Sequence, residues 1–279
     1  MPELPEVETI RRDLEREVSG KKIKGVEVHG LRSIRRHGTK KKFVSALDGR
    51  KIMSVGRKGK YLQLKLDDGN VLVIHLGMSG QLLRAKSARE KMPKHAHVVI
   101  VFTQGGQLRY VDPRTFGELF VSAPEDIDRQ VPELAHLGID PLEDAMSWAV
   151  FGRMLQAKKT KLKPLLMDQK FVAGIGNIYS DEILWTAGLL HDRPSDSLTS
   201  QEVRRLYRAM VETLQDAVKY RGSSIADEQY VDLFGELGQY QTHHNVYGRE
   251  GLACSRCRGV IQRIKVGQRS SFYCPGCQV

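Results

Sequence analysis

Four cysteines near the C-terminus constrain the fold of this chain more than any other feature of its sequence. Cys254 and Cys257 form one pair, and Cys274 and Cys277 form a second pair 16 residues later. Two close pairs joined by a hairpin-sized insert suit tetrahedral Zn²⁺, because each pair supplies two thiolates from a tight turn. The alternative is two disulfides, which a two-residue spacing disfavours in a chain without a secretion signal. We therefore expect one zinc ion, and a structural one, since four protein ligands leave no open position.

The insert between the cysteine pairs is itself informative. Its sequence, GVIQRIKVGQRSSFY, alternates strand-forming and basic residues. This pattern predicts a two-stranded basic ribbon of the kind that contacts DNA. His243 and His244 lie nearby, but with four thiolates available we interpret them as solvent-exposed or phosphate-facing rather than as metal ligands.

The charge of the chain favours a polyanionic partner. Its net charge is +11 and its pI is about 9.5. Residues 1–132 carry +10, residues 133–248 carry −4 and residues 249–279 carry +5. Nucleic acid is the first candidate partner and an anionic membrane surface the second. No apolar run approaches the roughly 18–20 residues of a membrane span, and the N-terminus lacks a signal-peptide core, so we expect a cytosolic protein.

The length and the hydrophobic periodicity predict two main domains. Residues 2–18 have helical spacing, and the following 100 residues read as short strands separated by turns, typical of an antiparallel sandwich or barrel. The segment KYLQLKL alternates and runs through the turn DDGN into VLVIHL, which predicts a hairpin. We therefore place an N-terminal domain at 1–122 and, because of three prolines, a linker at 123–142.

The second half of the chain changes to helical periodicity. Thr199 and Glu202 form a candidate capping box that begins a long amphipathic helix. The stretch VAGIGNIYSDEILW predicts a short helix near 177–186 after a glycine-rich entry, whose backbone amides could hold a phosphate. We place the helical domain at 143–248 and the zinc finger at 249–279.

The N-terminus is a candidate reagent. Pro2 would carry a secondary amine once Met1 is removed, and attack of such an amine on a sugar C1′ gives an iminium ion that serves as an electron sink. The adjacent Glu3 could protonate the sugar ring oxygen. On the residues alone, a proline that merely begins a helix is the simpler interpretation.

Six motifs in a fixed order change that balance. They are PELPEVETIRR, GRKGKYLQL, HLGMSGQL, DPRTFG, GIGNIYSDE and the four-cysteine tail with QRSSFYC. Together they closely resemble the bacterial formamidopyrimidine-DNA glycosylase family, which repairs 8-oxoguanine, over essentially the whole chain. The resemblance implies an α+β fold: an N-terminal antiparallel β-sandwich with a leading helix, then a helix-two-turn-helix domain with a four-cysteine zinc finger.

The resemblance also implies catalytic roles. Pro2 would be the Schiff-base nucleophile, and Glu3 the acid that assists opening of the sugar ring. Lys60 matches the family's proton donor in β-elimination. Arg269 matches the zinc-finger arginine tied to δ-elimination and phosphate binding; because its guanidinium stays charged, we interpret it as a phosphate clamp. Without the family, Lys60 would read as a solvated charge.

A base inside a duplex must be flipped out before it is excised, and the gap must be filled. Met78, Arg114 and Phe116 match the family's void-filling residues, although from sequence alone Met78 and Phe116 would more often belong to a core. Three further residues match phosphate-contacting positions of the family, where the residues alone would suggest surface or capping roles: His95, Lys158 and Asn177.

The chain departs from the family pattern at two places. Thr115 stands where a second basic residue is frequent, so one phosphate contact is expected to be missing. The segment 221–241 aligns with the loop over the everted base, which influences lesion choice, and it carries more acidic residues than expected.

The resulting prediction is a DNA glycosylase and abasic-site lyase that excises oxidised purines, namely 8-oxoguanine and formamidopyrimidines, by β,δ-elimination. Two alternatives stay open: an endonuclease VIII-like enzyme for oxidised pyrimidines, and a non-catalytic DNA-damage-binding relative. The expected partner is damaged double-stranded DNA, with no membrane and no nucleotide cofactor. We expect a monomer in the bacterial cytoplasm, associated with the nucleoid.

Overall fold

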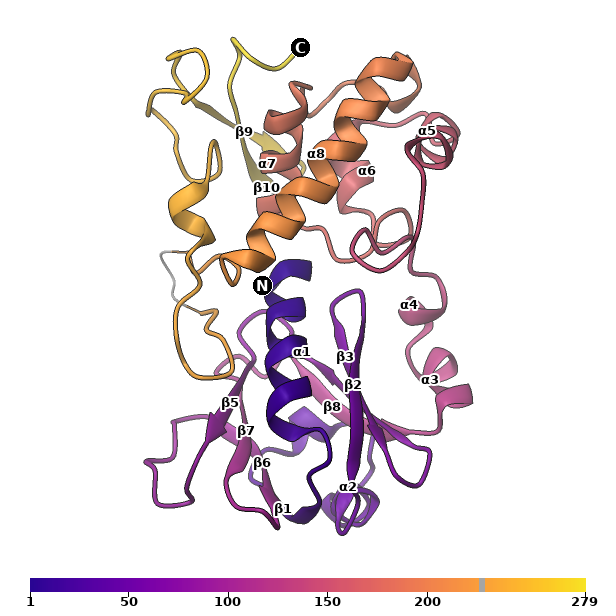
Figure 1. Cartoon of the computed structure of the whole chain (residues 1–279), viewed down its shortest axis with the longest axis vertical. Coiled ribbons are helices and arrows are strands. Elements are labelled where there is room, and N and C mark those ends of the chain that lie inside the picture. The colour runs from indigo at the N-terminus through magenta and orange to yellow at the C-terminus, as the bar shows by residue number, and fades with distance from the viewer. Residues whose placement is uncertain (226–228) are drawn as a thin grey trace. The chain divides into compact units, whose positions relative to one another are not determined.

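The alternating segments of the first half form two antiparallel sheets in the computed structural model, which describes residues 1–225 and 229–279 (Figure 1). One sheet has the order β1-β6-β7-β5 and comprises β1 (Ile23–Val28), β6 (Ala96–Phe102), β7 (Gln107–Val111) and β5 (Gln81–Ala85). The other has the order β2-β3-β4-β8 and comprises β2 (Ile52–Lys58), β3 (Tyr61–Leu66), β4 (Val71–His75) and β8 (Glu118–Ser122). The predicted antiparallel sandwich is therefore confirmed.

The hairpin between β3 and β4 has the predicted turn. Gly69 adopts a φ of +88°, a left-handed conformation that glycine adopts without steric cost. The amide of Leu66 donates to the carbonyl of Asn70 at 2.8 Å and closes the turn. Asn70 also hydrogen-bonds to the Asp68 side chain, as turn residues of this type do.

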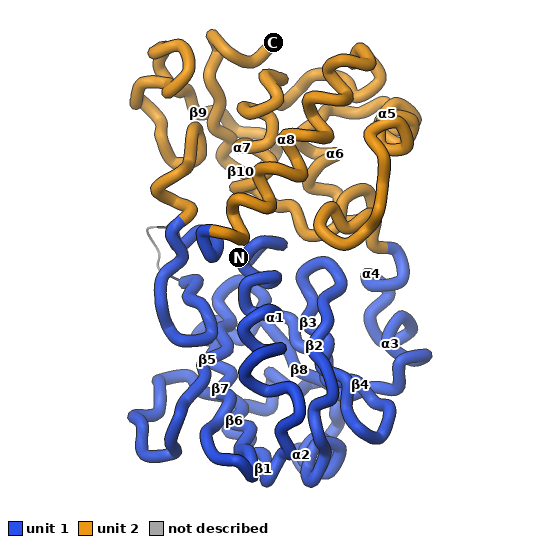
Figure 2. Tube along the Cα trace, viewed as in Figure 1, with its two compact units in different colours: residues 1–136, 220–239 blue, residues 137–219, 240–279 orange. Residues whose placement is uncertain are grey.

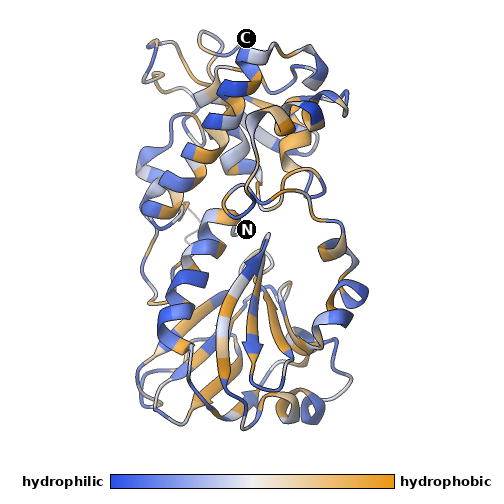
Figure 3. Ribbon diagram, turned by 45° about the vertical axis from the view of Figure 1, so that its right-hand side comes forward, coloured by the Kyte–Doolittle hydropathy of each residue, from blue (hydrophilic) through white to orange (hydrophobic). Residues whose placement is uncertain are grey.

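The core of the sandwich is closed by the N-terminal helix α1 (Leu4–Val18). Val7, Ile10 and Leu14 share one helical face and are buried in the same apolar cluster as the inward residues of both sheets. Each such side chain contributes roughly 1.5–3 kcal/mol through burial. Two shorter elements, η1 (Leu31–Ile34) and α2 (Lys40–Leu47), supply further apolar residues to this cluster. Figure 3 shows the hydrophobic residues concentrated on the strands of the sandwich.

The proline-rich segment that we interpreted as a linker contains two short helices, α3 (Pro124–Gln130) and α4 (Pro132–Ala135). Each begins with a proline, because the first turn of a helix does not need the amide hydrogen that proline lacks. Ile127 and Leu134 are buried. The segment is therefore partly folded.

The second half is helical, as predicted. Its helices are α5 (Trp148–Gln156), α6 (Leu162–Met167), α7 (Asn177–Ala187), η2 (Ser195–Ser197) and α8 (Ser200–Lys219). The predicted capping box precedes α8: Thr199 N donates to Glu202 Oε2 at 2.9 Å, and Glu202 N donates to Thr199 Oγ1 at 3.3 Å. The apolar residues predicted to face inward are buried along α8: Val203, Leu206, Met210, Leu214 and Val218.

The C-terminal segment forms the predicted ribbon. After η3 (Tyr240–His243), strands β9 (Gln262–Val266) and β10 (Arg269–Tyr273) pair antiparallel, with Ser271 opposite Ile264. Together with the helices and the sandwich, this ribbon gives the expected α+β architecture. Within the described residues, no helix combines the length and apolarity that crossing a bilayer requires.

The chain divides into two compact units (Figure 2). Unit 1 comprises residues 1–136 and 220–239, and unit 2 comprises residues 137–219 and 240–279. The sequence predicts that the segment 221–241 lies within the helical domain. Most of it packs with the sandwich instead, because its backbone and side chains hydrogen-bond to acidic residues of α1.

Candidate functional site

The N-terminal corner of α1 holds two buried carboxylates beside Pro2. Glu3 is the N-cap of α1, and its side chain accepts a hydrogen bond from the backbone of Glu6. Glu6 Oε2 in turn accepts from the amide of Glu3 at 2.8 Å, which completes a capping box made of two glutamates. Pro2 is buried, Glu3 is 3% exposed, and Met1 is 45% exposed. The residue predicted as the nucleophile therefore directly precedes a fixed carboxylate.

Lys60 lies in the tight turn between β2 and β3 and is only 8% exposed. The buried Arg57 fixes this turn: its Nη1 donates to the carbonyl of Gly59 at 3.1 Å, and its Nε pairs with Glu8 of α1 at 3.0 Å. The turn that carries Lys60 is thereby tied to the helix that carries Glu3.

Glu8 is the anionic centre of this connection. Its carboxylate accepts from Arg57 and also from Arg11 and Arg12 on its own helix. Burial by itself raises the pKa of the Glu8 carboxyl, but the hydrogen bonds from the three arginines outweigh it and lower the pKa from 4.5 to about 2. Glu8 is therefore ionised throughout the physiological pH range.

Asp112 organises the loop predicted to fill the gap in the duplex. Its fully buried carboxylate accepts from Ser79 Oγ at 2.6 Å and from the amides of Arg114 and Gly117 at 3.2 and 2.9 Å. The Tyr110 hydroxyl donates to it at 3.1 Å. One carboxylate thus holds the segment after β7 against the segment after β4.

A close backbone approach brings the two segments together. Gly77 has a φ of +62°, and a Cβ there would lie 2.5 Å from the amide nitrogen of Gly117, so no larger residue fits. The neighbouring Met78 and Phe116 are 41% and 44% exposed, although both are apolar. The Arg114 guanidinium lies over the Phe116 ring at 4.9 Å. The predicted void-filling residues therefore come together as an exposed group and not in the core.

Two neighbouring features extend this group. A cavity of about 500 Å³ beside Phe116 is lined by Arg32 and Arg35 of the η1 region and by Thr115. Exposed His95 has a positive φ of 62°, and its carbonyl accepts from the amide of Asp112 at 3.1 Å. Thr115 itself adopts a φ of 53°, so the residue that departs from the family pattern is part of the turn that presents Phe116.

In unit 2, the start of α7 is joined to the start of β10 by Asn177, whose side chain bonds to the residue after Arg269. Asn177 begins α7, and its side-chain Nδ2 donates to the carbonyl of Ser270 at 2.9 Å. Its Oδ1 is buried without a hydrogen-bond partner among the described atoms. Arg269 immediately precedes Ser270 and is exposed. The Asn177 side chain thus binds the residue that follows Arg269, and both Asn177 and Arg269 are predicted to contact DNA.

A buried ion pair fixes this arrangement. Lys163 Nζ and Asp181 Oδ1 are 2.5 Å apart, and each side chain is 1% exposed. Asp181 also accepts from Ser271 Oγ at 2.7 Å and from the amide of Phe272 at 2.9 Å. Burial raises the pKa of the Asp181 carboxyl, while the charge of Lys163 and the hydrogen bonds from Phe272 and Ser271 oppose that rise. Asp181 therefore holds β10 against α7.

Lys158 lies apart from this pair. It follows the end of α5, is exposed, and its amide donates to the carbonyl of Leu155 at 3.2 Å. In the described part of the chain, no side-chain contact joins it to Asn177 or Arg269. Its predicted phosphate contact therefore rests on the resemblance alone.

The four cysteines form one compact group. Their Sγ atoms all lie within 4.8 Å of one another, and Cys254 and Cys274 are buried. The closest pairs, Cys257–Cys274 at 3.4 Å and Cys254–Cys277 at 3.8 Å, are too far apart for disulfides. Four thiolates at this spacing fit a single structural zinc ion, so the disulfide alternative is wrong. His243 and His244 are not part of the group; His243 is exposed as expected, whereas His244 is buried.

The zinc finger is docked on the end of α7. The Arg256 guanidinium stacks over the Trp185 ring at 4.1 Å and donates to the Trp185 carbonyl at 3.2 Å. Glu182, fully enclosed, accepts from the amides of Val246 and Tyr247 at 2.9 and 2.8 Å. One helix therefore carries Asn177 at its start and supports the zinc finger along its length.

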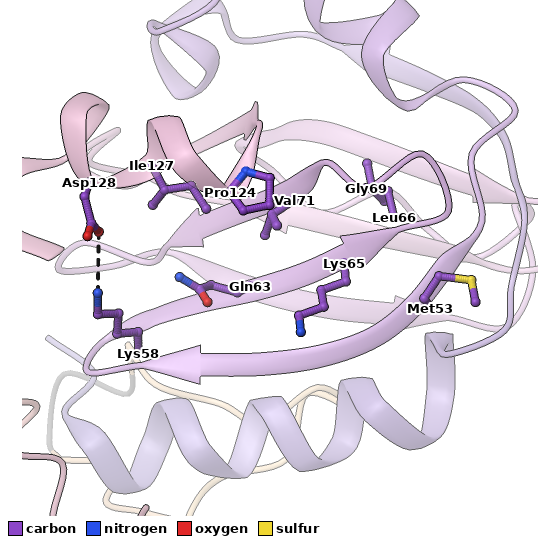
Figure 4. Close-up of a pocket in the computed structure, with 10 residues that line it drawn as sticks. All are labelled: Met53, Lys58, Gln63, Lys65, Leu66, Gly69, Val71, Pro124, Ile127 and Asp128. Atoms are coloured by element: carbon purple, nitrogen blue, oxygen red, sulfur yellow. Dashed lines mark hydrogen bonds and ion pairs between the residues drawn. The ribbon is translucent and has the colours of Figure 1, made fainter. Parts of the chain in front are cut away.

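A second cavity, of about 560 Å³, lies on the outer side of β2 and β3 beside α3 (Figure 4). Lys58 and Asp128 pair across one end of it at 3.4 Å. Its lining is largely apolar, with Lys65 and Gln63 on the strand side. None of the predicted catalytic residues lines this cavity, so it is not the predicted active site.

Several residues that build the site were not singled out from the sequence. They are the buried acids and their partners: Glu8, Arg57, Asp112, Lys163, Asp181 and Glu182. For all of these except Lys163, the available signal was a position inside the recognised motifs; for example, DPRTFG begins with Asp112 and GIGNIYSDE ends with Asp181 and Glu182. A carboxylate beside a turn or a helix start commonly binds backbone amides.

Comparison with known proteins agrees with the predicted family. Three family models match in order: the formamidopyrimidine-DNA glycosylase N-terminal domain at residues 1–119, the formamidopyrimidine-DNA glycosylase H2TH domain at 137–229, and the zinc finger found in FPG and IleRS at 251–279. Formamidopyrimidine-DNA glycosylases of Heliobacterium modesticaldum and Pelotomaculum thermopropionicum are 45% and 41% identical to this chain. The alignments cover all of it and 100% and 99% of the relatives.

Solved structures agree over nearly the full length. The crystal structure of MutM (Fpg) protein from Thermus thermophilus is 40% identical, with a TM-score of 0.87, and the match covers 99% of this chain and 98% of that one. The complex between the Lactococcus lactis Fpg and DNA containing an abasic site is 35% identical, with a TM-score of 0.89, and covers 99% of both chains. This chain therefore belongs to the formamidopyrimidine-DNA glycosylase family.

Proposed function

We propose that this protein excises oxidised purines from duplex DNA through a Schiff base at Pro2 and then cleaves the abasic strand. The observation that carries the proposal is the N-terminal corner of α1, where the buried Pro2 directly precedes Glu3, whose carboxylate is fixed in a capping box with Glu6. An amine in that position has an acid beside it, as opening of a sugar ring requires. The family assignment supports the same chemistry.

The reaction follows from these groups. After Met1 is removed, the neutral amine of Pro2 forms a bond to C1′ and loses its proton, and the damaged base leaves with the electrons of the glycosidic bond and takes up a proton. Glu3 donates a proton to the ring oxygen as the C1′–O4′ bond breaks, which gives an iminium ion at C1′. Loss of a C2′ proton then expels the 3′ phosphate, and a further elimination expels the 5′ phosphate. Hydrolysis of the iminium releases Pro2.

The other predicted residues would serve these steps. We assign Lys60 to proton donation during β-elimination, and its burial in a turn tied to α1 supports a fixed position. Arg269, exposed beside Ser270, would clamp a phosphate during δ-elimination. The zinc ion, when bound to the four cysteines, supplies structural cross-linking of the β9–β10 ribbon.

The DNA partner is proposed on the solved relatives and on the exposed groups. The Lactococcus lactis relative was solved with DNA that contains an abasic site. Met78, Arg114 and Phe116 would fill the gap left by an everted base, because an apolar wedge and a guanidinium suit that role. His95, Lys158 and Asn177 would contact phosphates. We further propose that the enzyme acts as a monomer without a nucleotide cofactor, at the nucleoid of the bacterial cytoplasm.

We retain the predicted functional parts, with residues 1–122 for catalysis, 143–248 for DNA binding and 249–279 as the zinc finger. The segment 221–241 hydrogen-bonds to α1, which supports a role for this segment beside the catalytic residues of the N-terminal part. Its described portion includes Asp232 and Glu236, and the other two acidic residues predicted there lie outside the described residues.

Borohydride trapping tests the proposal. The protein is incubated with an 8-oxoguanine:C duplex and borohydride, and we expect a covalent adduct that Pro2→Gly abolishes while duplex binding persists. Absence of an adduct with the Met-processed protein would refute the proposal. A stronger adduct with a thymine glycol duplex would indicate the endonuclease VIII-like activity, which the family matches do not favour. Loss of both trapping and binding in Pro2→Gly would mean that Pro2 is structural.

A further inference from the structure

Arg221 joins the start of the segment 220–239 to α1. Its guanidinium lies between two carboxylates: Nη2 and Nη1 pair with Asp13 of α1, and Nε and Nη2 pair with Asp232 at 2.9 and 2.6 Å. Arg221 also has a φ of 61°, so its backbone is held in the left-handed region that a branched or long side chain seldom adopts. The side chain is in effect a two-sided clamp.

Both carboxylates pair with this guanidinium, and Asp13 also pairs with Arg16. The Asp13 side chain is fully buried and that of Asp232 is 3% exposed. Asp232 also accepts from the amides of Phe234 and Glu236 at 2.9 and 3.0 Å, so it builds the turn that follows it. A buried carboxylate such as that of Asp232 is destabilised when it loses its cation. Arg221 therefore sets where the segment begins and how its second half turns.

A second attachment lies further towards the start of α1. The amide of Ser223 donates to Glu6 Oε1 at 2.8 Å, while Glu6 Oε2 holds the amide of Glu3. Glu6 and Asp13 are seven residues apart, which places them on the same face of the helix. Gly222, which lies between Arg221 and Ser223, passes so close to α1 that a Cβ there would lie 2.7 Å from Glu6 Oε1.

These contacts form a continuous connection from Arg221 to the predicted acid. We propose that Arg221 is a positioning residue for base excision: by clamping Asp13 and Asp232, it keeps Ser223 on Glu6 and so keeps Glu6 and Glu3 in their capping box. The inference rests on the proposed function, because Glu3 matters only if it protonates the sugar ring. Arg221 itself contacts no reacting atom.

The chemistry gives a means of separating this role from a general structural one. Base excision needs the ring oxygen to be protonated, which is the step assigned to Glu3. An abasic site that is already present equilibrates with its open aldehyde, which reacts with the Pro2 amine without that step. Mispositioning of Glu3 should therefore slow excision while it leaves attack on a preformed abasic site nearly unchanged.

Arg221→Ala and Arg221→Lys test the proposal, with Arg16→Ala as the matched control. Arg16 also pairs with Asp13, at 2.5 Å, but it is 68% exposed and has no contact with the segment 220–239 among the described residues. Arg221→Lys keeps the charge, and with it the fold, but cannot serve two carboxylates as a planar fork does. Melting temperatures identify any variant that fails to fold.

The measurements are single-turnover excision of 8-oxoguanine and borohydride trapping on a preformed abasic site. In both Arg221 variants we expect excision to fall on the order of 10- to 100-fold, the usual cost of a small misplacement, with trapping on the abasic site within about twofold of wild type. Arg16→Ala should change neither. Excision within about twofold of wild type in Arg221→Lys, or an equal fall in excision and trapping, would overturn the proposal. Absence of both activities in the wild type would instead refute the proposed function.

Discussion

Removal of the Asp181 carboxylate should destabilise unit 2 more than any exposed substitution in the same unit. Asp181→Ala leaves the buried Lys163 ammonium, 2.5 Å from the lost oxygen, without its counter-charge. Breaking a buried pair in this way costs about 3–5 kcal/mol. Ser271 Oγ and the Phe272 amide lose their acceptor as well. With a urea dependence of roughly 2 kcal/mol per molar, the unfolding midpoint should fall by about 2 M.

Tryptophan fluorescence isolates this transition, because the two tryptophans of the chain, Trp148 and Trp185, both belong to unit 2. Replacing both partners, as Lys163→Met with Asp181→Leu, should be less destabilising than Asp181→Ala, since no charge is left unpaired. The exposed pair of Arg208 with Glu212 is the control, and Glu212→Ala should cost less than about 0.5 kcal/mol. A loss of less than about 1 kcal/mol in Asp181→Ala would show that the buried pair does not hold α7 and β10 together.

Three further predictions concern Glu8, Asp112 and the four-cysteine group. The pKa of Glu8 is about 2 in the folded protein and about 4.5 in the unfolded chain, so the stabilisation it gives is complete above pH 4.5 and is lost as the pH falls towards 2. The free energy of unfolding of the wild type should therefore fall by about 3 kcal/mol more across that window than that of Glu8→Gln. Parallel acid-unfolding curves for the two proteins would contradict this. Asp112→Ala should lower the rate of single-turnover excision from a duplex at least tenfold, because the loop that presents Phe116 loses the acceptor for two of its amides. An unchanged rate would show that the position of this loop does not affect catalysis. Chelation of zinc, or the substitution Cys257→Ser, should abolish duplex binding measured by fluorescence anisotropy. Added zinc should restore binding by the chelated wild type. Binding that survives removal of the metal would show that the β9–β10 ribbon folds without zinc.

Much of the fold was accessible from the sequence because its local signals agree with its tertiary contacts. The turn at Gly69, the capping box at Thr199 and the cysteine pairs each specify a local structure, and each forms as predicted. The place of residues 220–239 was not accessible. It is set by ion pairs and hydrogen bonds to α1, more than 200 residues away in sequence, and no periodicity records such a contact.

The candidate site shows the same division. Pro2, Lys60 and Arg269 could be named because they fall in motifs with a recognised order, not because of their spacing. The residues that hold them are buried acids, and a glutamate or aspartate in a sequence gives no sign of whether it faces water or amides. Glu8 and Asp181 are distinguishable from surface acids only once their donors are known.

The recurring device in both units is a buried carboxylate that binds amides or arginines from a distant segment. Glu8 ties α1 to the turn that carries Lys60, and Asp112 ties two loops together beneath Phe116. Asp181 ties α7 to β10 next to Arg269. An apolar contact would hold these segments equally near, but it is tolerant of small shifts, whereas two or three directed hydrogen bonds fix position and orientation together. Buried acids that no sequence pattern distinguishes from surface acids therefore determine where the predicted catalytic and DNA-binding side chains lie.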